Sequence, residues 1–134
     1  MNALEYFNAM VDSAVRNKQQ SLQDFDDNLL AGGLLYAIEW STRQAEGVAL
    51  ADMWLDVRRG AESEMEETGD KDEAVRVYSV LTDAVASATR SLLRNYFRAS
   101  NTDMFTNAIN GARAEAASRF VQDAERVIKM FDKE

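Results

Sequence analysis

The stretch that decides the fold is "AVRVYSVLTDAVASATRSLL", residues 74–93. Its apolar residues recur every three or four positions, which is the spacing of one face of an α-helix. We therefore expect an amphipathic helix here. The residues on its apolar face are Ala74, Val77, Tyr78, Leu81, Val85, Ala88 and Leu92.

The same spacing continues on both sides of this stretch, and no run of residues alternates as a strand would. We expect about five helices and an all-α, compact bundle, with residues 1–134 forming a single domain. The predicted core is Val77, Leu81, Val85, Leu92, Ile109, Phe120 and Val127.

The predicted helix boundaries depend on polar stretches and glycines, because the chain contains no proline. The first helix is expected over residues 2–18, and a polar loop over 17–28. Asp26 or Asp27 would begin the second helix, which carries Leu29, Leu30, Leu34, Ile38 and Trp40. Gly47 would separate the second helix from the third, and Ser100 with Asp103 would cap the last. Gly32 and Gly33 lie inside an apolar run, so we interpret them as a close contact between helices.

Composition limits the chemistry. The chain has no histidine and no cysteine, so the commonest general base near neutral pH and all thiol chemistry are absent. Helical Mg²⁺-dependent pyrophosphohydrolases use Glu-x-x-Glu on one helix and Glu-x-x-Asp on a later one. Glu64 and Glu67 supply the first motif, but the next helix has no glutamate after Glu73, and Asp83 alone does not complete the second. We expect no enzyme activity, no cofactor, no catalytic residue and no metal site. A carboxylate and Mg²⁺-dependent enzyme is the least favoured alternative.

No apolar run is long enough to cross a membrane, and the N-terminal residues are interrupted by Glu5, Asn8 and Asp12. We expect a soluble, cytoplasmic protein without a membrane contact.

The most unusual segment is "ESEMEETGDKDE", residues 62–73, which we call the acidic junction. It contains seven acids and one base, a net charge of −6 in a chain of net charge −8. Gly69 is expected to end one helix. Asp70 and Glu73 are expected to form a capping box that begins the next. These local roles account for Asp70, Asp72 and Glu73.

The four remaining acids, Glu62, Glu64, Glu66 and Glu67, have no such local role. They lie in the last turns of a helix, where the helix dipole favours bases, and Glu62 and Glu66 form a like-charge i,i+4 pair. Two interpretations stay open: a solvated helix end, or a docking surface for a basic partner. The predicted partner-binding residues are Glu62, Glu64, Glu66, Glu67, Asp70 and Asp72.

Two further features have more than one interpretation. Arg90, Arg94 and Arg98 form a basic stripe, but bases are also favourable at a helix C-terminus, so we expect no direct contact with nucleic acid. Trp40 and Trp54 are either core residues or interface anchors.

The expected function is that of a small acidic binding protein. It would act as an inhibitor or adaptor that occludes a basic surface of a protein partner, which includes a surface that binds nucleic acid. Phage and mobile-element proteins that block host machinery, some by mimicking DNA charge, provide the analogy. The alternative is a structural or assembly protein that self-associates, for example as a homodimer, through its helical faces.

Overall fold

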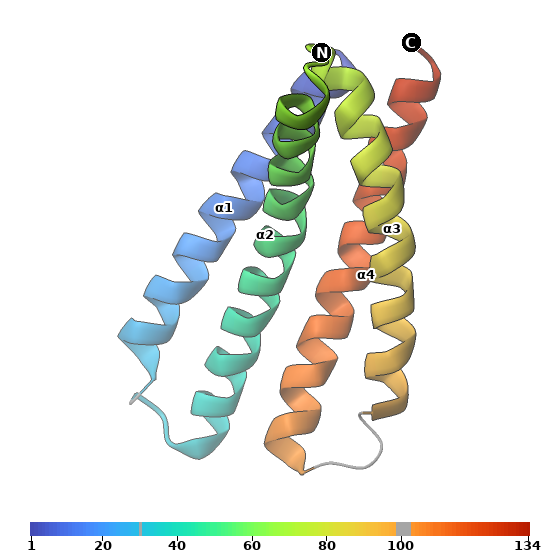
Figure 1. Ribbon diagram of the computed structural model, residues 1–134. Coiled ribbons are helices and arrows are strands. Elements are labelled where there is room, and N and C mark those ends of the chain that lie inside the picture. The colour runs from blue at the N-terminus through green and yellow to red at the C-terminus, as the bar shows by residue number, and fades with distance from the viewer. Residues whose placement is uncertain (30, 99–102) are drawn as a thin grey trace.

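Four helices make up the fold in the computed structural model, which describes residues 1–29, 31–98 and 103–134, without the side chains of 95–98. The helices form two antiparallel hairpins, α1 with α2 and α3 with α4, which lie side by side (Figure 1). The predicted all-α bundle is confirmed, with four helices in place of about five. The helices are α1 (Ala3–Asn28), α2 (Leu34–Thr68), α3 (Glu73–Arg98) and α4 (Met104–Asp132).

Helix α1 is longer than predicted, because residues 17–28 continue it and form no loop. This segment is polar, but it contains neither proline nor glycine. Side-chain pairs four residues apart support it: Gln20 Nε2 donates to Asp24 Oδ1 at 2.8 Å and Gln23 Nε2 to Asp27 Oδ1 at 2.9 Å. Asp26 and Asp27 therefore lie in the last turn of α1 and do not cap a new helix.

Helix α2 is a single helix of 35 residues, so the predicted break at Gly47 is wrong. Gly47 faces α1, and a Cβ atom added there would lie 2.5 Å from the Ser21 Oγ atom. The glycine thus permits the two helices of the first hairpin to approach closely. The break falls earlier, at Gly33, whose φ of +80° suits glycine at the position before α2. Gly32 and Gly33 are exposed, so they do not form the predicted contact between helices.

Substitution of Gly47 by alanine tests this explanation. In an ordinary helical position, replacing glycine by alanine should raise the free energy of unfolding by about 0.5–1 kcal/mol. Gly111→Ala, for which an added Cβ meets nothing within 4 Å, should show that gain. Gly47→Ala should lose it to the contact with Ser21, which urea denaturation of both variants would measure. An equal gain in the two variants would contradict the close approach at Gly47.

Trp54, on α2, lies at the centre of the core, where it is only 1% exposed. Its ring centroid is 4.9 Å from that of Phe120 on α4, in an edge-on arrangement, and 6.0 Å from that of Phe7 on α1. Edge-on and tilted pairs at these distances are favourable beyond the area that they bury. One side chain therefore joins α2 to a helix of each hairpin.

Four of the seven predicted core residues are confirmed. Val77, Leu81, Phe120 and Val127 are fully buried, while the remaining three predicted residues are half-buried. Those three are Val85, Leu92 and Ile109.

The two termini lie at the same end of the bundle as the acidic junction, and the starts of α2 and α4 lie at the opposite end (Figure 1). The Glu134 Oε1 atom accepts a hydrogen bond from the Ala3 N–H at 2.7 Å, which ties α1 to the C-terminal residue.

Asp103 caps α4 by accepting from the Thr106 N–H at 2.9 Å. Leu30, Ser100 and the side chain of Arg98 lie outside the described residues. Over the described part of the chain, no helix has both the length and the apolar character needed to span a membrane.

Candidate functional site

The acidic junction includes the end of α2, the four connecting residues 69–72 and the first residue of α3, and local hydrogen bonds hold it together. Gly69 ends α2 with a φ of +69°, and its N–H donates to the Met65 carbonyl at 3.0 Å, so the predicted terminator is confirmed. Thr68 Oγ1 donates to the Glu64 carbonyl at 2.7 Å and accepts from the Asp70 N–H at 3.3 Å. The end of α2 is therefore closed by its own side chains.

Helix α3 begins three residues after Asp70, so the predicted capping box of Asp70 with Glu73 is wrong. Asp72 takes the capping position, and its Oδ1 atom accepts from the Val75 N–H at 3.4 Å. Asp70 instead closes a turn, because its Oδ1 atom accepts from the Asp72 N–H at 2.9 Å.

Arg76, in the first turns of α3, neutralises part of the junction. Its Nε and Nη2 atoms donate to the Asp70 Oδ2 atom at 3.1 and 2.8 Å, and its Nη1 atom lies 3.7 Å from the Glu64 Oε2 atom. That Glu64 oxygen is shielded from solvent and accepts no hydrogen bond. Two of the six predicted binding residues, Glu64 and Asp70, are thus engaged within the protein.

These contacts lower the pKa of the Asp70 carboxyl below its ordinary value of 3.8. The hydrogen bond from the Asp72 N–H has the largest effect, followed by those from Arg76, because both favour the ionised form. The same pairing raises the pKa of Arg76.

Acid should therefore weaken the junction. Since the pKa of Asp70 is lower in the folded protein than in the unfolded chain, its contribution to stability is complete above pH 3.8 and is lost as the pH falls through the folded pKa. The melting temperature of Asp70→Asn should fall less than that of the wild type between about pH 5 and pH 2.5. Thermal melts at both pH values check this, with Asp83→Asn, an exposed acid elsewhere on α3, as the control for loss of one charge. An equal fall in Asp70→Asn and wild type would contradict the assignment.

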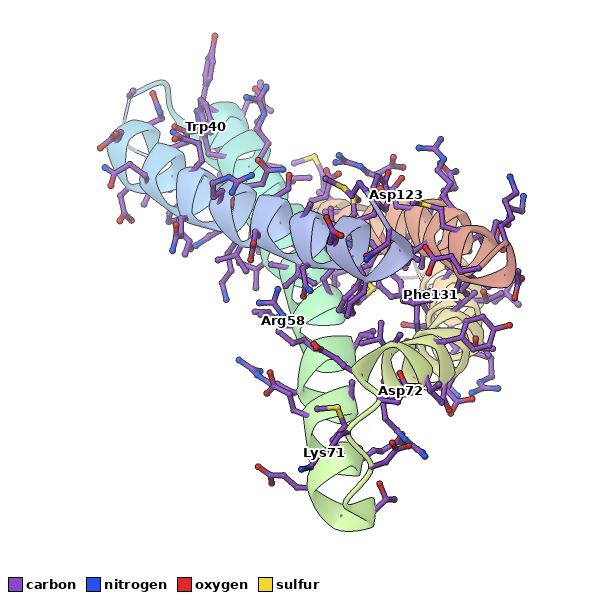
Figure 2. The ribbon with its side chains drawn as sticks, turned by 90° about the horizontal axis from the view of Figure 1, so that it is seen from above. Trp40, Arg58, Lys71, Asp72, Asp123 and Phe131 are labelled. Atoms are coloured by element: carbon purple, nitrogen blue, oxygen red, sulfur yellow. The ribbon has the colours of Figure 1, made fainter. Side chains whose placement is uncertain are left out.

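The other four predicted residues, Glu62, Glu66, Glu67 and Asp72, are exposed. Within the described part of the chain none of them forms an ion pair. Ala61 is the last buried residue of α2, and the last turns of the helix project past α1 and α4 (Figure 2). These carboxylates are consequently presented to solvent on a projecting end.

A shallow hollow of about 440 Å³ lies beside two of these acids, Glu62 and Glu66. It is lined by Glu62, Met65, Glu66, Gly69, Asp70 and Lys71. Met65 provides an apolar, adaptable surface between carboxylates. The side chain of a lysine or arginine has matching chemistry, since its aliphatic stem packs on apolar surface while its charged end meets an acid.

Sequence reasoning missed Arg76 and Met65 as members of this surface. A signal for Arg76 is present, because a base near the N-terminal end of a helix is locally unfavourable and suggests an acidic partner nearby. Met65 gives no such signal, since its position beside the hollow follows only from the end of α2.

The two tryptophans have different environments. Trp54 is a core residue, as described above. Trp40 is half-buried, and the guanidinium carbon of Arg43 lies 4.7 Å from its ring centroid.

The basic stripe at the end of α3 is exposed at Arg90 and Arg94. Among the described residues, no three acids are grouped in a way that could hold a metal ion.

Comparison of the chain with protein-family models, with curated proteins and with solved structures finds no match.

Proposed function

We propose that this protein is a non-catalytic binding protein whose acidic junction docks on a basic surface of a protein partner. In this role it acts as an inhibitor or adaptor by covering that surface. Glu62, Glu66, Glu67 and Asp72 make the docking contacts, while Glu64 and Asp70 hold the junction in shape through Arg76.

The observation that carries this proposal is the hollow over Met65, which is lined by Lys71 and by three carboxylates, of which only Asp70 is held by an ion pair in the described part of the chain, with Arg76. Glu62 and Glu66 line it and are exposed and unpaired among the described residues. An incoming lysine or arginine therefore meets free acids and displaces no existing ion pair. Such complementary charge mainly raises the rate of association and the specificity of binding.

The local cost of the arrangement also supports a role in binding. The last turn of α2 contains no base, although the negative end of the helix dipole favours one. Glu62 and Glu66 repel each other across one turn. Acids that lower helix stability in this way are expected where a surface is selected for binding.

The partner surface that fits best is one rich in lysine and arginine, and a basic patch of this kind is typical of surfaces that bind nucleic acid. A protein that covers such a surface excludes the nucleic acid, as in the phage and mobile-element analogy. DNA should then compete with this protein for the partner and should not bind this protein directly.

Affinity capture with a matched control tests the proposal. The immobilised wild-type protein is exposed to a lysate of its native host at about 50 and 300 mM salt, where screening of exposed charges differs strongly. The variant Glu62→Gln with Glu66→Gln and Glu67→Gln removes three acids of the junction. The control removes three exposed acids elsewhere, Asp83→Asn, Glu115→Gln and Glu125→Gln, so both variants have a net charge of −5 in place of −8.

We expect the wild type and the control to retain a basic protein at low salt, and the junction variant to lose it. Added DNA should release the same protein. Retention of the same proteins by all three baits at both salt concentrations would contradict the proposal.

One observation favours the alternative function, a structural or assembly protein that self-associates: large apolar side chains are exposed at the end of the bundle opposite the acidic junction.

A further inference from the structure

The end of the bundle opposite the acidic junction exposes large apolar side chains. Leu34 and Leu35, at the start of α2, are 73% and 74% exposed, and Phe105, at the start of α4, is 50% exposed. Both helix starts lie at this end (Figure 1). Of the nine large apolar residues that the described part of the chain exposes, six lie here, so the exposure is not scattered over the surface. The six are Leu34, Leu35, Tyr36, Leu93, Met104 and Phe105.

The six residues divide between the two hairpins. We call Leu34, Leu35 and Tyr36 the Leu35 group, which belongs to the first hairpin, and Leu93, Met104 and Phe105 the Phe105 group, which belongs to the second. Together they expose on the order of 600 Å² of surface, given the size of such side chains. This approaches the roughly 800 Å² that each partner contributes to a standard protein–protein interface.

The charges beside the two groups differ in sign, except that Asp103, the exposed cap of α4, is an acid directly before Met104. Asp26 and Asp27 lie in the last turn of α1, next to the Leu35 group, and are exposed. Arg90 and Arg94 lie near the end of α3, on the side of the Phe105 group, and are also exposed. None of these four charges forms an ion pair with another described residue. The two acids are locally unfavourable, because the last turn of α1 contains no base.

We propose that this end of the bundle binds a second copy of the same chain in a twofold, end-to-end dimer. The Leu35 group of each copy packs against the Phe105 group of the other. A twofold axis perpendicular to the long axis of the bundle makes both contacts at once, as an isologous interface requires. It also sets the acids of α1 in one copy opposite the arginines of α3 in the other.

A hollow between the two hairpins supports this pairing. It has a volume of about 620 Å³ and is lined by apolar residues, among them Phe25, Val48, Phe105 and Ile109, together with Ser41, Gln44, Asp52 and Arg113. Because Phe105 belongs both to the hollow and to the exposed group, apolar side chains extend from the end of the bundle inward. The leucines of the second copy thus have a recess to enter as well as a surface to cover.

The dimer places the two acidic junctions at its far ends, since each junction lies at the opposite end of its own bundle. If the junction binds a basic partner, as proposed above, the dimer presents two such surfaces. Two linked sites increase the apparent affinity for a partner that is itself repeated or oligomeric. The dimer itself does not depend on that function, and its tests below use no partner.

Sedimentation equilibrium of the purified chain between roughly 1 and 100 μM tests the proposal. The wild type should change from a mass of 15.0 kDa toward twice that value as the concentration rises. Leu35→Glu and Phe105→Glu should each weaken association by at least about tenfold, because each places an unpaired charge in an apolar contact. Val75→Glu is the matched control: Val75 is 51% exposed, but it lies beside the acidic junction, so association should be unchanged. Circular dichroism shows that each variant is folded.

A charge exchange tests which group faces which. Asp26→Lys with Asp27→Lys makes both sides of the interface basic, and Arg90→Glu with Arg94→Glu makes both acidic. Each variant alone should repel itself and associate more weakly than the wild type. A mixture of the two should restore association, because every basic side then meets an acidic one.

A mass of 15.0 kDa at every concentration overturns the dimer. So does a loss of association in Val75→Glu as large as that in Leu35→Glu. A mixture of the charge variants that associates no better than either alone overturns the proposed pairing of the two groups.

Discussion

Replacement of Trp54 by alanine is expected to lower the free energy of unfolding by about 3–5 kcal/mol, the usual loss for a large aromatic residue in a core. Trp54 is 1% exposed and contacts Phe7 and Phe120, so the substitution leaves a cavity where three helices meet. Since a domain of this size is stable by only about 5–15 kcal/mol, the variant should be close to unfolding. Urea denaturation followed by circular dichroism measures the change.

Trp40→Ala is the matched control, because the same atoms are removed from a half-buried position on the same helix. Its loss should be much smaller, since part of the Trp40 ring remains in water in the folded protein. Equal losses in the two variants would show that the core is not centred on Trp54.

The second large effect is expected at Leu81, which is fully buried on α3. Leu81→Ala should lower the free energy of unfolding by about 2–5 kcal/mol through lost burial and the cavity that remains. Alanine at Val75, which is 51% exposed on the same helix and lies outside the proposed dimer interface, provides the control and should cost less than about 1 kcal/mol. Urea denaturation curves of both variants measure the two losses in the free energy of unfolding. A loss below about 1 kcal/mol for Leu81→Ala would place this face of α3 at the surface.

The part of the fold that could be predicted from the sequence is the part where one helix face is buried. On α3 the apolar residues recur without interruption, so both the helix and its most buried residues, Val77 and Leu81, followed from spacing alone. Val77, Leu81 and Ala88 lie along the middle of this face, whereas Val85 and Leu92 are turned toward one edge of it, which explains why they are half-buried. Spacing identifies a face but does not tell how far across it the neighbouring helices extend.

The helix boundaries of the first hairpin could not be predicted, because they depend on contacts between helices. A glycine that ends a helix and a glycine that lets a neighbouring helix approach look the same in a sequence. Gly47 is of the second kind, which only the position of Ser21 reveals. Residues 17–28 were predicted as a loop because they are polar, yet a solvent-facing helix is also polar, and the i,i+4 pairs of Gln20 and Gln23 stabilise one there.

The sequence predicted which acidic residues belong to the candidate site, but it did not predict the ion pairs that two of them form with Arg76. The concentration of acids in residues 62–73 is evident in the sequence, and the exposure of Glu62, Glu66 and Glu67 agrees with it. The engagement of Glu64 and Asp70 by Arg76 was not foreseen, because it depends on the turn that carries α3 back along α2.

The central claim is that the acidic junction is a docking surface, and the kinetics of binding test it most directly. The basic protein recovered by affinity capture is purified, and its association with the wild type and with the two triple variants is measured over a range of salt concentrations. The variant without Glu62, Glu66 and Glu67 should associate about tenfold or more slowly at low salt, with a shallower salt dependence and a similar dissociation rate. The control with the same net charge should behave as the wild type does. If the junction variant binds as fast and as salt-dependently as the wild type, the acidic junction is only a solvated helix end.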